Sequence, residues 1–277
     1  MLKTRVITAL VLLAVLLPAL FLLPPRGWAV LTLLAMSAAA WEWGRLCGFA
    51  RRGAVFLALL TAASGALVLL LPQGDEVGRV LLYAAAAMWI IAVPAWLRWR
   101  ERVPAGLPLA VLGWLLLLAC WYAVWKFREF GSLYLLLLMI TVWVADIAAY
   151  FAGKTFGRHK LAPAISPGKT WEGVAGAVLG VQVYALALLL TAAAAPNYFA
   201  GLGARLGVAG TLVAALLLTA VSVVGDLFES LLKRRVGLKD SSNLLPGHGG
   251  VLDRIDALVS TLPVALALAM LLAAALA

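Results

Sequence analysis

Runs of about twenty apolar residues recur from one end of the chain to the other, and they limit most strongly how it can fold. Each run is long enough to cross a hydrocarbon core ~30 Å thick as a helix. Hydrophobic residues fill 65% of the 277 positions and charged residues only 12%, which leaves too little polar surface for a soluble domain of this length. We therefore predict an all-α, polytopic transmembrane helical bundle of about nine spans, at residues 6–23, 28–44, 54–71, 80–97, 105–124, 132–152, 173–195, 207–231 and 251–276.

The first apolar run resembles a signal sequence, because Lys3 and Arg5 precede it. It ends in Pro24-Pro25-Arg26 without a convincing small-residue cleavage site. We therefore expect this run to be retained as the first span.

Pro94 and Pro108 lie inside apolar runs, and the short second run ends in aromatic and charged residues. We expect neighbouring helices to accommodate kinks at Pro94 and Pro108. At the end of the second run, we expect Trp41, Glu42 and Trp43 to lie at the membrane interface.

Lysine and arginine are distributed unevenly over the loops between the predicted spans. Seventeen lie on the side of the N-terminus and five on the other side. The positive-inside rule then places the N-terminus in the cytoplasm and the C-terminus outside. The polar loops 153–172 and 232–250 face the cytosol in this topology. The net charge of +10 is explained by topology and by contact with anionic membrane lipids, so it does not indicate nucleic-acid binding.

Cysteine and histidine are too scarce for the sites that they usually build. Cys47 and Cys120 are far apart in sequence, so we expect neither a disulfide framework nor a cysteine-ligated metal. The two histidines, His159 and His248, are too few for a zinc site of the usual kind.

Residues 230–256 combine nine ionisable side chains and four glycines between two apolar runs. Just upstream, Asp226, Glu229 and Ser230 share one helical face, although Glu229 could simply pair with Lys233 one turn later. Carboxylates in an apolar helix usually face a cavity, a partner or an ion. We therefore treat this stretch as the candidate active site, as a place for phosphates and a divalent cation.

The last predicted span begins with two carboxylates, Asp253 and Asp256, directly after a glycine-rich turn. Glycines and a helix N-terminus together form a natural phosphate seat, although carboxylates there could also act only as a helix cap. Asp253 and Asp226 could hold Mg²⁺, whose usual ligands are one or two carboxylates and substrate phosphate. We expect His248 either to contact phosphate or to stabilise the turn.

A second polar cluster follows Asp146 and extends over loop 153–172. Its Gly168-Lys169-Thr170 is similar to the end of a P-loop, but the earlier glycine that this motif needs is Pro163, and we expect no strand before it. We reject a P-loop. Lys169 as a point charge and Thr170 as a hydroxyl donor still suit an anion site.

The two clusters together resemble the phosphatidate cytidylyltransferase family, also called CDP-diacylglycerol synthases. The resemblance covers about the last 130 residues, so we divide the chain into N-terminal transmembrane helices (1–130), without a specific motif, and a catalytic part (131–277). The segment Ser166–Gly173 is similar to one recurring stretch of the family. The family's signature is matched without departure by Ser230, Leu232-Lys233-Arg234, Lys239-Asp240, Leu245-Pro246, His248-Gly249-Gly250-Val251 and Asp253-Arg254-Ile255-Asp256.

The resemblance implies an inner-membrane enzyme of phospholipid biosynthesis that converts CTP and phosphatidic acid to CDP-diacylglycerol and pyrophosphate. It also implies a homodimer that uses Mg²⁺, with room for a second, monovalent cation such as K⁺. Metal ligation is carried over to Asp226 and Asp253, with Asp256 and Asp146 as further candidates. The expected catalytic residues are Asp226, Lys239, Asp240, His248, Asp253, Arg254 and Asp256, and the expected substrate-binding residues are Ser166, Lys169, Thr170, Ser230, Lys233, Arg234, Gly249 and Gly250.

Two other functions remain open at this point. A CDP-alcohol phosphotransferase would need a D-G-x-x-A-R start and aspartates at four-residue steps, whereas Asp253 and Asp256 are three residues apart. An ion-coupled transporter fits nine spans, with Asp146 and Asp226 as ion sites, but it leaves the polar stretch 230–256 unexplained.

Overall fold

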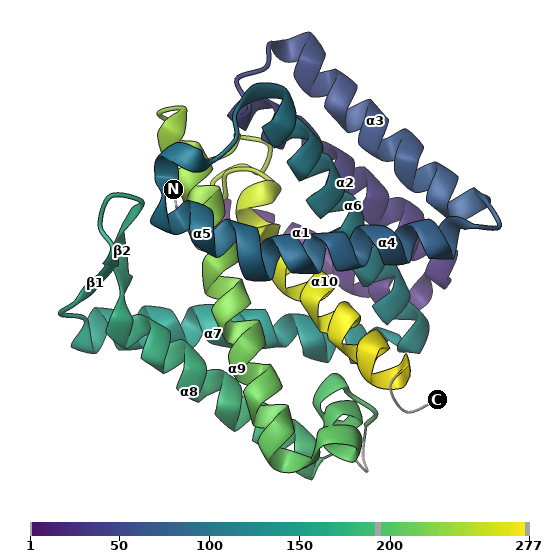
Figure 1. The fold of residues 1–277 in the computed structure, drawn as a ribbon, viewed down its shortest axis with the longest axis vertical. Coiled ribbons are helices and arrows are strands. Elements are labelled where there is room, and N and C mark those ends of the chain that lie inside the picture. Colours follow the sequence, from purple (N-terminus) through teal and green to yellow (C-terminus); the bar gives the residue numbers. More distant parts are fainter. Residues whose placement is uncertain (1, 192–194, 275–277) are drawn as a thin grey trace.

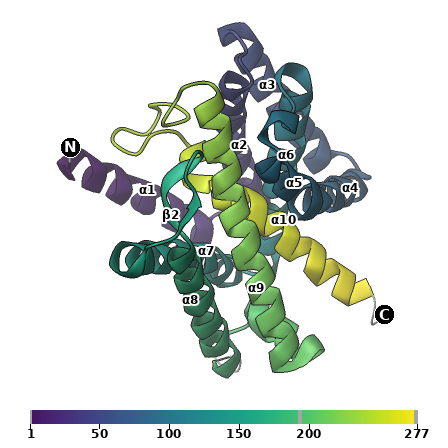
Figure 2. The ribbon, with the colours of Figure 1, turned by 60° about the vertical axis from the view of Figure 1, so that its left-hand side comes forward.

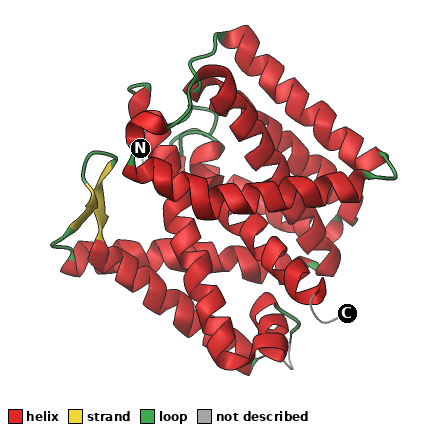
Figure 3. Cartoon of the chain, in the orientation of Figure 1, coloured by secondary structure: helices red, strands yellow, loops and turns green. Residues whose placement is uncertain are grey.

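A computed structural model describes residues 2–191 and 195–274 as a bundle of helices with one small hairpin (Figures 1, 2 and 3). The last residues of the predicted seventh and ninth spans, 192–194 and 275–276, lie outside the described residues, and so do the side chains of Lys3 and Arg5. The elements are α1 (Leu2–Leu22), α2 (Pro25–Leu46), α3 (Arg51–Leu70), α4 (Gly74–Ala87), π-helix η1 (Met88–Ala92), α5 (Val93–Arg98), 3₁₀-helix η2 (Arg100–Arg102), α6 (Gly106–Phe130), α7 (Ser132–Phe156), β1 (Lys160–Ala162), β2 (Ser166–Thr170), α8 (Trp171–Leu190), α9 (Tyr198–Arg235) and α10 (Leu252–Ala274).

Each predicted span corresponds to one helical unit of the described chain, with α4, η1 and α5 forming one continuous unit. Among the described residues, seven of these units are long and apolar enough to cross a membrane, from α3 onward. The helix α1 contributes a shorter apolar segment, Val6–Leu22. The prediction of an all-α transmembrane bundle is therefore confirmed.

The backbone irregularities lie where proline or glycine interrupts a helix. The π-helix η1 ends directly before α5, whose first turn contains Pro94, so the extra residue of the π-turn accommodates the proline. Pro108 lies in the first turn of α6, where a proline needs no kink. In α9, Gly207 adopts φ 65°, which separates a short helix at 198–206 from the predicted span.

The loops gather at two opposite ends of the bundle, as the predicted topology requires. At the end of the bundle opposite loops 153–172 and 232–250, Arg128 and Ser132 donate hydrogen bonds to the last turn of α1. Lys126 forms an ion pair with Asp75 at the same end. The other end unites the loops that we predicted to be cytosolic, through Thr8 Oγ1 to Pro246 O (2.8 Å), Arg45 Nη1 to Ser241 O (3.4 Å), Arg234 Nε to Ile165 O (3.4 Å) and Arg235 Nη1 to Pro104 O (3.0 Å).

Small residues let the helices of the second half approach closely. Gly176 of α8 lies against Ala152 of α7, and a Cβ at Gly176 would collide with it. At the crossing of α9 and α10, Gly225 leaves no room for a Cβ beside Ser260. Such small-residue contacts are the usual way in which transmembrane helices associate. They bring the carboxylates of α7, α9 and α10 to the same end of the bundle.

A buried aromatic cluster joins the two halves of the chain. The ring of Phe228 on α9 lies 6.2 Å from Trp43, 5.9 Å from Trp89 and 6.0 Å from Trp96, measured between ring centroids. Trp43 also donates from Nε1 to the carbonyl of Leu109 at 2.8 Å. Our expectation that Glu42 and Trp43 are interfacial is wrong, because both side chains are buried inside the protein.

The tight crossing of α9 and α10 is testable by substitution. We expect Gly225→Leu to lower the free energy of unfolding in detergent by about 1–3 kcal/mol, because the larger side chain forces the helices apart. Ala220→Leu is the control, since Ala220 is exposed on the same helix and should change stability by less than about 0.5 kcal/mol. Equal stability of the two variants, measured by thermal unfolding, would contradict this packing.

Candidate active site

A cavity of about 460 Å³ opens between α7, α8, α9 and the β-hairpin. Four charged side chains line it, namely Asp146 and Lys154 of α7, Lys169 of β2 and Asp226 of α9. Its remaining wall is mostly apolar, with Val174 and Val223 among the lining residues. The cavity therefore combines a charged centre with an apolar wall at the end of the bundle where the active-site loops meet.

The antiparallel hairpin β1–β2 brings Lys169 into this cavity, and we did not predict these strands. Its geometry is fixed where α8 begins, because Thr170 Oγ1 accepts from the N–H of Gly173 at 3.1 Å and thus caps the helix. Glu172 also pairs with His159 at 2.6 Å. Gly168 and Lys169 lie within β2 and not in a loop before a helix, so the rejection of a P-loop agrees with the structure. Ser166 also lines the cavity.

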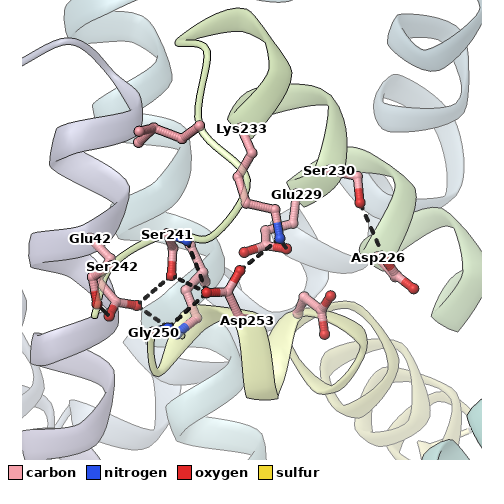
Figure 4. A network of polar contacts seen from close by, with 12 residues as sticks. Glu42, Asp226, Glu229, Ser230, Lys233, Ser241, Ser242, Gly250 and Asp253 are labelled. Carbon is pink, nitrogen blue, oxygen red and sulfur yellow. Dashed lines mark hydrogen bonds and ion pairs between the residues drawn. The ribbon is translucent and has the colours of Figure 1, made fainter. Parts of the chain in front are cut away.

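Lys169 and Asp226 form an ion pair across the cavity, with 2.5 Å between Nζ and Oδ2. The other oxygen of Asp226 accepts from the Ser230 hydroxyl at 3.3 Å, which confirms the helical face that we predicted for these two residues (Figure 4). Both partners of the ion pair are partly exposed to the cavity, at 24% and 31% of their side-chain surface. A substrate anion and a cation could therefore each replace one partner of this pair.

Asp253 is held by protein groups on both of its oxygens. Oδ1 accepts from Lys233 at 2.7 Å, while Oδ2 accepts from the N–H of Ser241 at 2.9 Å, its hydroxyl at 2.9 Å and the N–H of Gly250 at 2.7 Å. Lys233 also bonds to Glu229, so the pairing that we considered for these two residues is present. The side chain of Asp253 is only 2% exposed. In this structure Asp253 therefore joins Lys233 and the loop residues Ser241 and Gly250 to the first turn of α10.

The loop that connects α9 to α10, residues 236–251, is called the signature loop below. Gly249 has φ 86° and lies against Asp253 and Asp240, so a side chain there would be both strained and obstructed. Lys239, Asp240 and Arg254 are exposed. The N–H of His248 closes a turn to Leu245 at 2.8 Å, whereas its Nδ1 is buried without a hydrogen-bond partner among the described residues.

Sequence reasoning did not assign a site role to Glu42, which is fully buried at the end of α2. Its carboxylate accepts from the hydroxyls of Ser241 and Ser242 at 3.1 and 2.5 Å, and from the N–H groups of Val251 and Leu252 at 3.0 and 2.6 Å (Figure 4). The N–H groups that we expected to face a phosphate therefore bind Glu42 in this structure. Only its acidic character inside an apolar run could have pointed to it.

The carboxylates of the site form a connected electrostatic group. The charges of Asp226, Lys169 and Arg254 act on Asp146. The charges of Asp256, Lys233 and Asp253 act on Glu229. The charges of Asp226 and Asp146 both act on Asp256. With all groups ionised, the five carboxylates face three cationic side chains, which leaves an excess of negative charge. A buried charge excess is costly, and either protonation of carboxyl groups or a bound cation reduces it.

The geometry fits a metal site that substrate phosphates complete better than a site built from protein ligands alone. Within residues 2–191 and 195–274, no three Asp, Glu, His or Cys side chains lie close enough together to form an all-protein metal site. Mg²⁺ typically takes one or two carboxylates and completes its coordination with water and substrate phosphates. Asp226 and Asp146, which line the same cavity, match that requirement. Asp256 lies within their electrostatic range, whereas Asp253 would first have to leave its present partners.

The sequence of the chain is similar to a family of known proteins. A model described as the cytidylyltransferase family matches residues 3–272. A phosphatidate cytidylyltransferase of Pseudomonas aeruginosa is 43% identical to this chain, and the match covers 97% of each of the two proteins. Proteins of the same name from Haemophilus influenzae and Staphylococcus aureus are 35% and 32% identical, and these matches cover 95% and 94% of this chain and 96% of each relative. The resemblance seen in the signature is confirmed, and the chain belongs to the cytidylyltransferase family.

Proposed function

We propose that this membrane nucleotidyltransferase transfers the cytidylyl group of CTP to phosphatidic acid, giving CDP-diacylglycerol and pyrophosphate. Family membership over nearly the whole chain supports the reaction class, and the names of the relatives support the lipid substrate. The single structural observation that carries the proposal is the Lys169–Asp226 ion pair inside a cavity between membrane-spanning helices. The remaining wall of this cavity is mostly apolar. A phosphotransferase or a transporter would not account for the family match.

The residues suit a reaction in which charge neutralisation is the main difficulty. A phosphate oxygen of phosphatidic acid bonds to the α-phosphorus of CTP, and the bond from that phosphorus to the β-phosphate oxygen breaks with release of pyrophosphate. The nucleophile is already ionised at neutral pH, so no strong general base is required. Two polyanions must instead be brought together, and cationic side chains and metal ions achieve this in phosphoryl-type transfers. Lys169, which lines the cavity, and the exposed Lys239 and Arg254 would bind the triphosphate and the lipid phosphate.

A divalent cation would be held by Asp226 together with Asp146 or Asp256, and in a second arrangement by Asp253. When bound, Mg²⁺ supplies charge neutralisation on the phosphate oxygens. The carboxylates orient this charge, and Lys169 becomes free to bind phosphate once Asp226 has another partner. The excess negative charge of the carboxylate group supports a divalent ion and leaves room for a monovalent ion such as K⁺.

The bacterial relatives support an inner-membrane enzyme, and the arrangement of the loops supports an active site that faces the cytosol. CTP would enter from water at the end of the bundle that carries the signature loop and hairpin, while the acyl chains remain beside the apolar wall of the cavity. The excess of lysine and arginine at this end supports a cytoplasmic N-terminus and an external C-terminus. The family resemblance supports a homodimer.

The role of Asp226 is testable by a substitution that removes only its charge. We expect Asp226→Asn to lower kcat for CDP-diacylglycerol formation by about a hundredfold or more, because the cavity then loses a carboxylate that would hold the divalent cation at the reacting phosphates. Asp75→Asn, at the opposite end of the bundle, is the matched control and should retain normal activity. The measurement is Mg²⁺-dependent product formation in detergent–lipid micelles. Normal activity of a folded Asp226→Asn variant would contradict the assignment.

Lys169 should act mainly through binding of the anionic substrates. We expect Lys169→Met to raise the KM for CTP about tenfold to a hundredfold, which corresponds to the loss of one charged hydrogen bond of about 1.5–3 kcal/mol. Lys169→Arg retains the positive charge and should be affected less. Steady-state kinetics with varied CTP measure the difference. Equal KM values for the two variants and the wild type would show that Lys169 does not contact the nucleotide.

A further inference from the structure

We propose that Glu42, in the N-terminal part of the chain, is a positioning residue that holds the signature loop and the first turn of α10 in their working arrangement. This inference rests on the proposed function, because its consequence is the placement of Asp253 and the loop residues for cytidylyl transfer. Glu42 itself is about 200 positions away from the residues that it binds. It would act through them and not on the substrate.

Glu42 contacts the signature loop at two places, residues 241–242 and residue 251, and it also contacts the first residue of α10. One carboxylate oxygen accepts from the Ser242 hydroxyl and the Val251 N–H, and the other accepts from the Ser241 hydroxyl and the Leu252 N–H. The first free N–H groups of α10 are thus satisfied by a carboxylate from another helix. A negative charge at this position also interacts favourably with the N-terminal end of the helix dipole.

The chemistry of these contacts requires a carboxylate. Two hydroxyls and two backbone N–H groups converge on Glu42, and a carboxylate offers acceptor sites to all of them. A glutamine of the same size would turn an NH₂ group toward two of these donors. A buried donor that faces another donor loses its hydrogen bond and pays its full desolvation cost. The size of the side chain alone therefore does not explain Glu42.

Ser241 connects this contact to the proposed active site. Its hydroxyl lies 3.1 Å from Glu42 and 2.9 Å from Asp253, and its N–H also donates to Asp253 at 2.9 Å. Gly250 lies between the two carboxylates, and a Cβ at this position would collide with both Ser241 and Glu42. Displacement of Glu42 would therefore release the groups that hold Asp253 in place (Figure 4).

The end of α2 is fixed independently of Glu42. The adjacent Trp43 bonds to Leu109 and packs against Phe228, and Gly44 lies closely against Ala54 of α3. These contacts remain when the carboxylate is replaced. A Glu42 variant should therefore retain the bundle while the signature loop becomes mobile, which separates positioning from a general effect on folding.

The test combines hydrogen exchange with kinetics on the full-length protein carrying Glu42→Gln. We expect the amides of 250–252 to exchange at least tenfold faster than in the wild type, while amides in the middle of α10 keep their protection. We also expect kcat to fall about tenfold to a hundredfold, and the Mg²⁺ concentration for half-maximal activity to rise by a similar factor, because groups that orient metal-binding carboxylates have effects of this size. Glu76→Gln is the control, since Glu76 is an exposed carboxylate near the opposite end of the bundle.

The outcomes separate this inference from the proposed function. Unchanged exchange and unchanged Mg²⁺ dependence in Glu42→Gln would overturn the positioning role. A lower kcat with unchanged exchange and Mg²⁺ dependence would also overturn it, because it would indicate only a smaller folded fraction. If the wild type forms no CDP-diacylglycerol, the proposed function fails, but the exchange measurement still tests the contact. Should Glu42→Gln not fold, Ser242→Ala removes one donor with little change in packing. Faster exchange at 251 supports the inference, and wild-type exchange there contradicts it.

Discussion

The structure depends on the balance of charge at the end of the bundle where α7, α9 and α10 meet. Carboxylates inside a membrane protein are costly unless they are paired or bind an ion. Here they are distributed between two arrangements. Asp226 pairs with Lys169 inside a cavity, while Asp253 is enclosed by Lys233 and backbone N–H groups. The close crossing of α9 and α10 at Gly225 keeps the two arrangements adjacent.

This division suggests separate tasks for the two arrangements. The cavity is open and contains an ion pair that a cation and a phosphate could both replace, so it suits substrate and metal binding. The signature loop is held by hydrogen bonds at residues 241–242 and 250–251. In contrast, Lys239, Asp240 and Arg254 remain exposed. Those exposed groups are available for phosphates once the loop is held. Rigid support for mobile, charged side chains is the usual way in which an active site limits the cost of ordering its parts.

Much of the fold and several contacts of the candidate site could be predicted from the sequence. The nine apolar runs follow from the thickness of a bilayer, and the four-residue spacing in one helix indicated that Asp226 is near Ser230 and that Glu229 is near Lys233. The role of Glu42 could not be predicted in the same way. Its partners are about 200 residues distant, and no helical or strand periodicity connects segments so far apart.

The hairpin illustrates the same limit at short range. Ser166-Pro167-Gly168-Lys169-Thr170 has no alternating apolar pattern, and the strand pairs only with three residues before it. Its position is determined by tertiary contacts, such as that of Arg234 with the carbonyl of Ile165. Sequence reasoning placed Lys169 in an anion site, but its pairing with Asp226 depends on how α8 and α9 pack.

The most direct test of the account is to follow the phosphorus atoms of CTP. Purified protein with phosphatidic acid and Mg²⁺ would be given CTP labelled either at the α- or at the γ-phosphate. Cytidylyl transfer predicts that the α-label enters the lipid product and that the γ-label appears only in pyrophosphate. A γ-label in the lipid, or no labelled lipid from either nucleotide, would contradict the account.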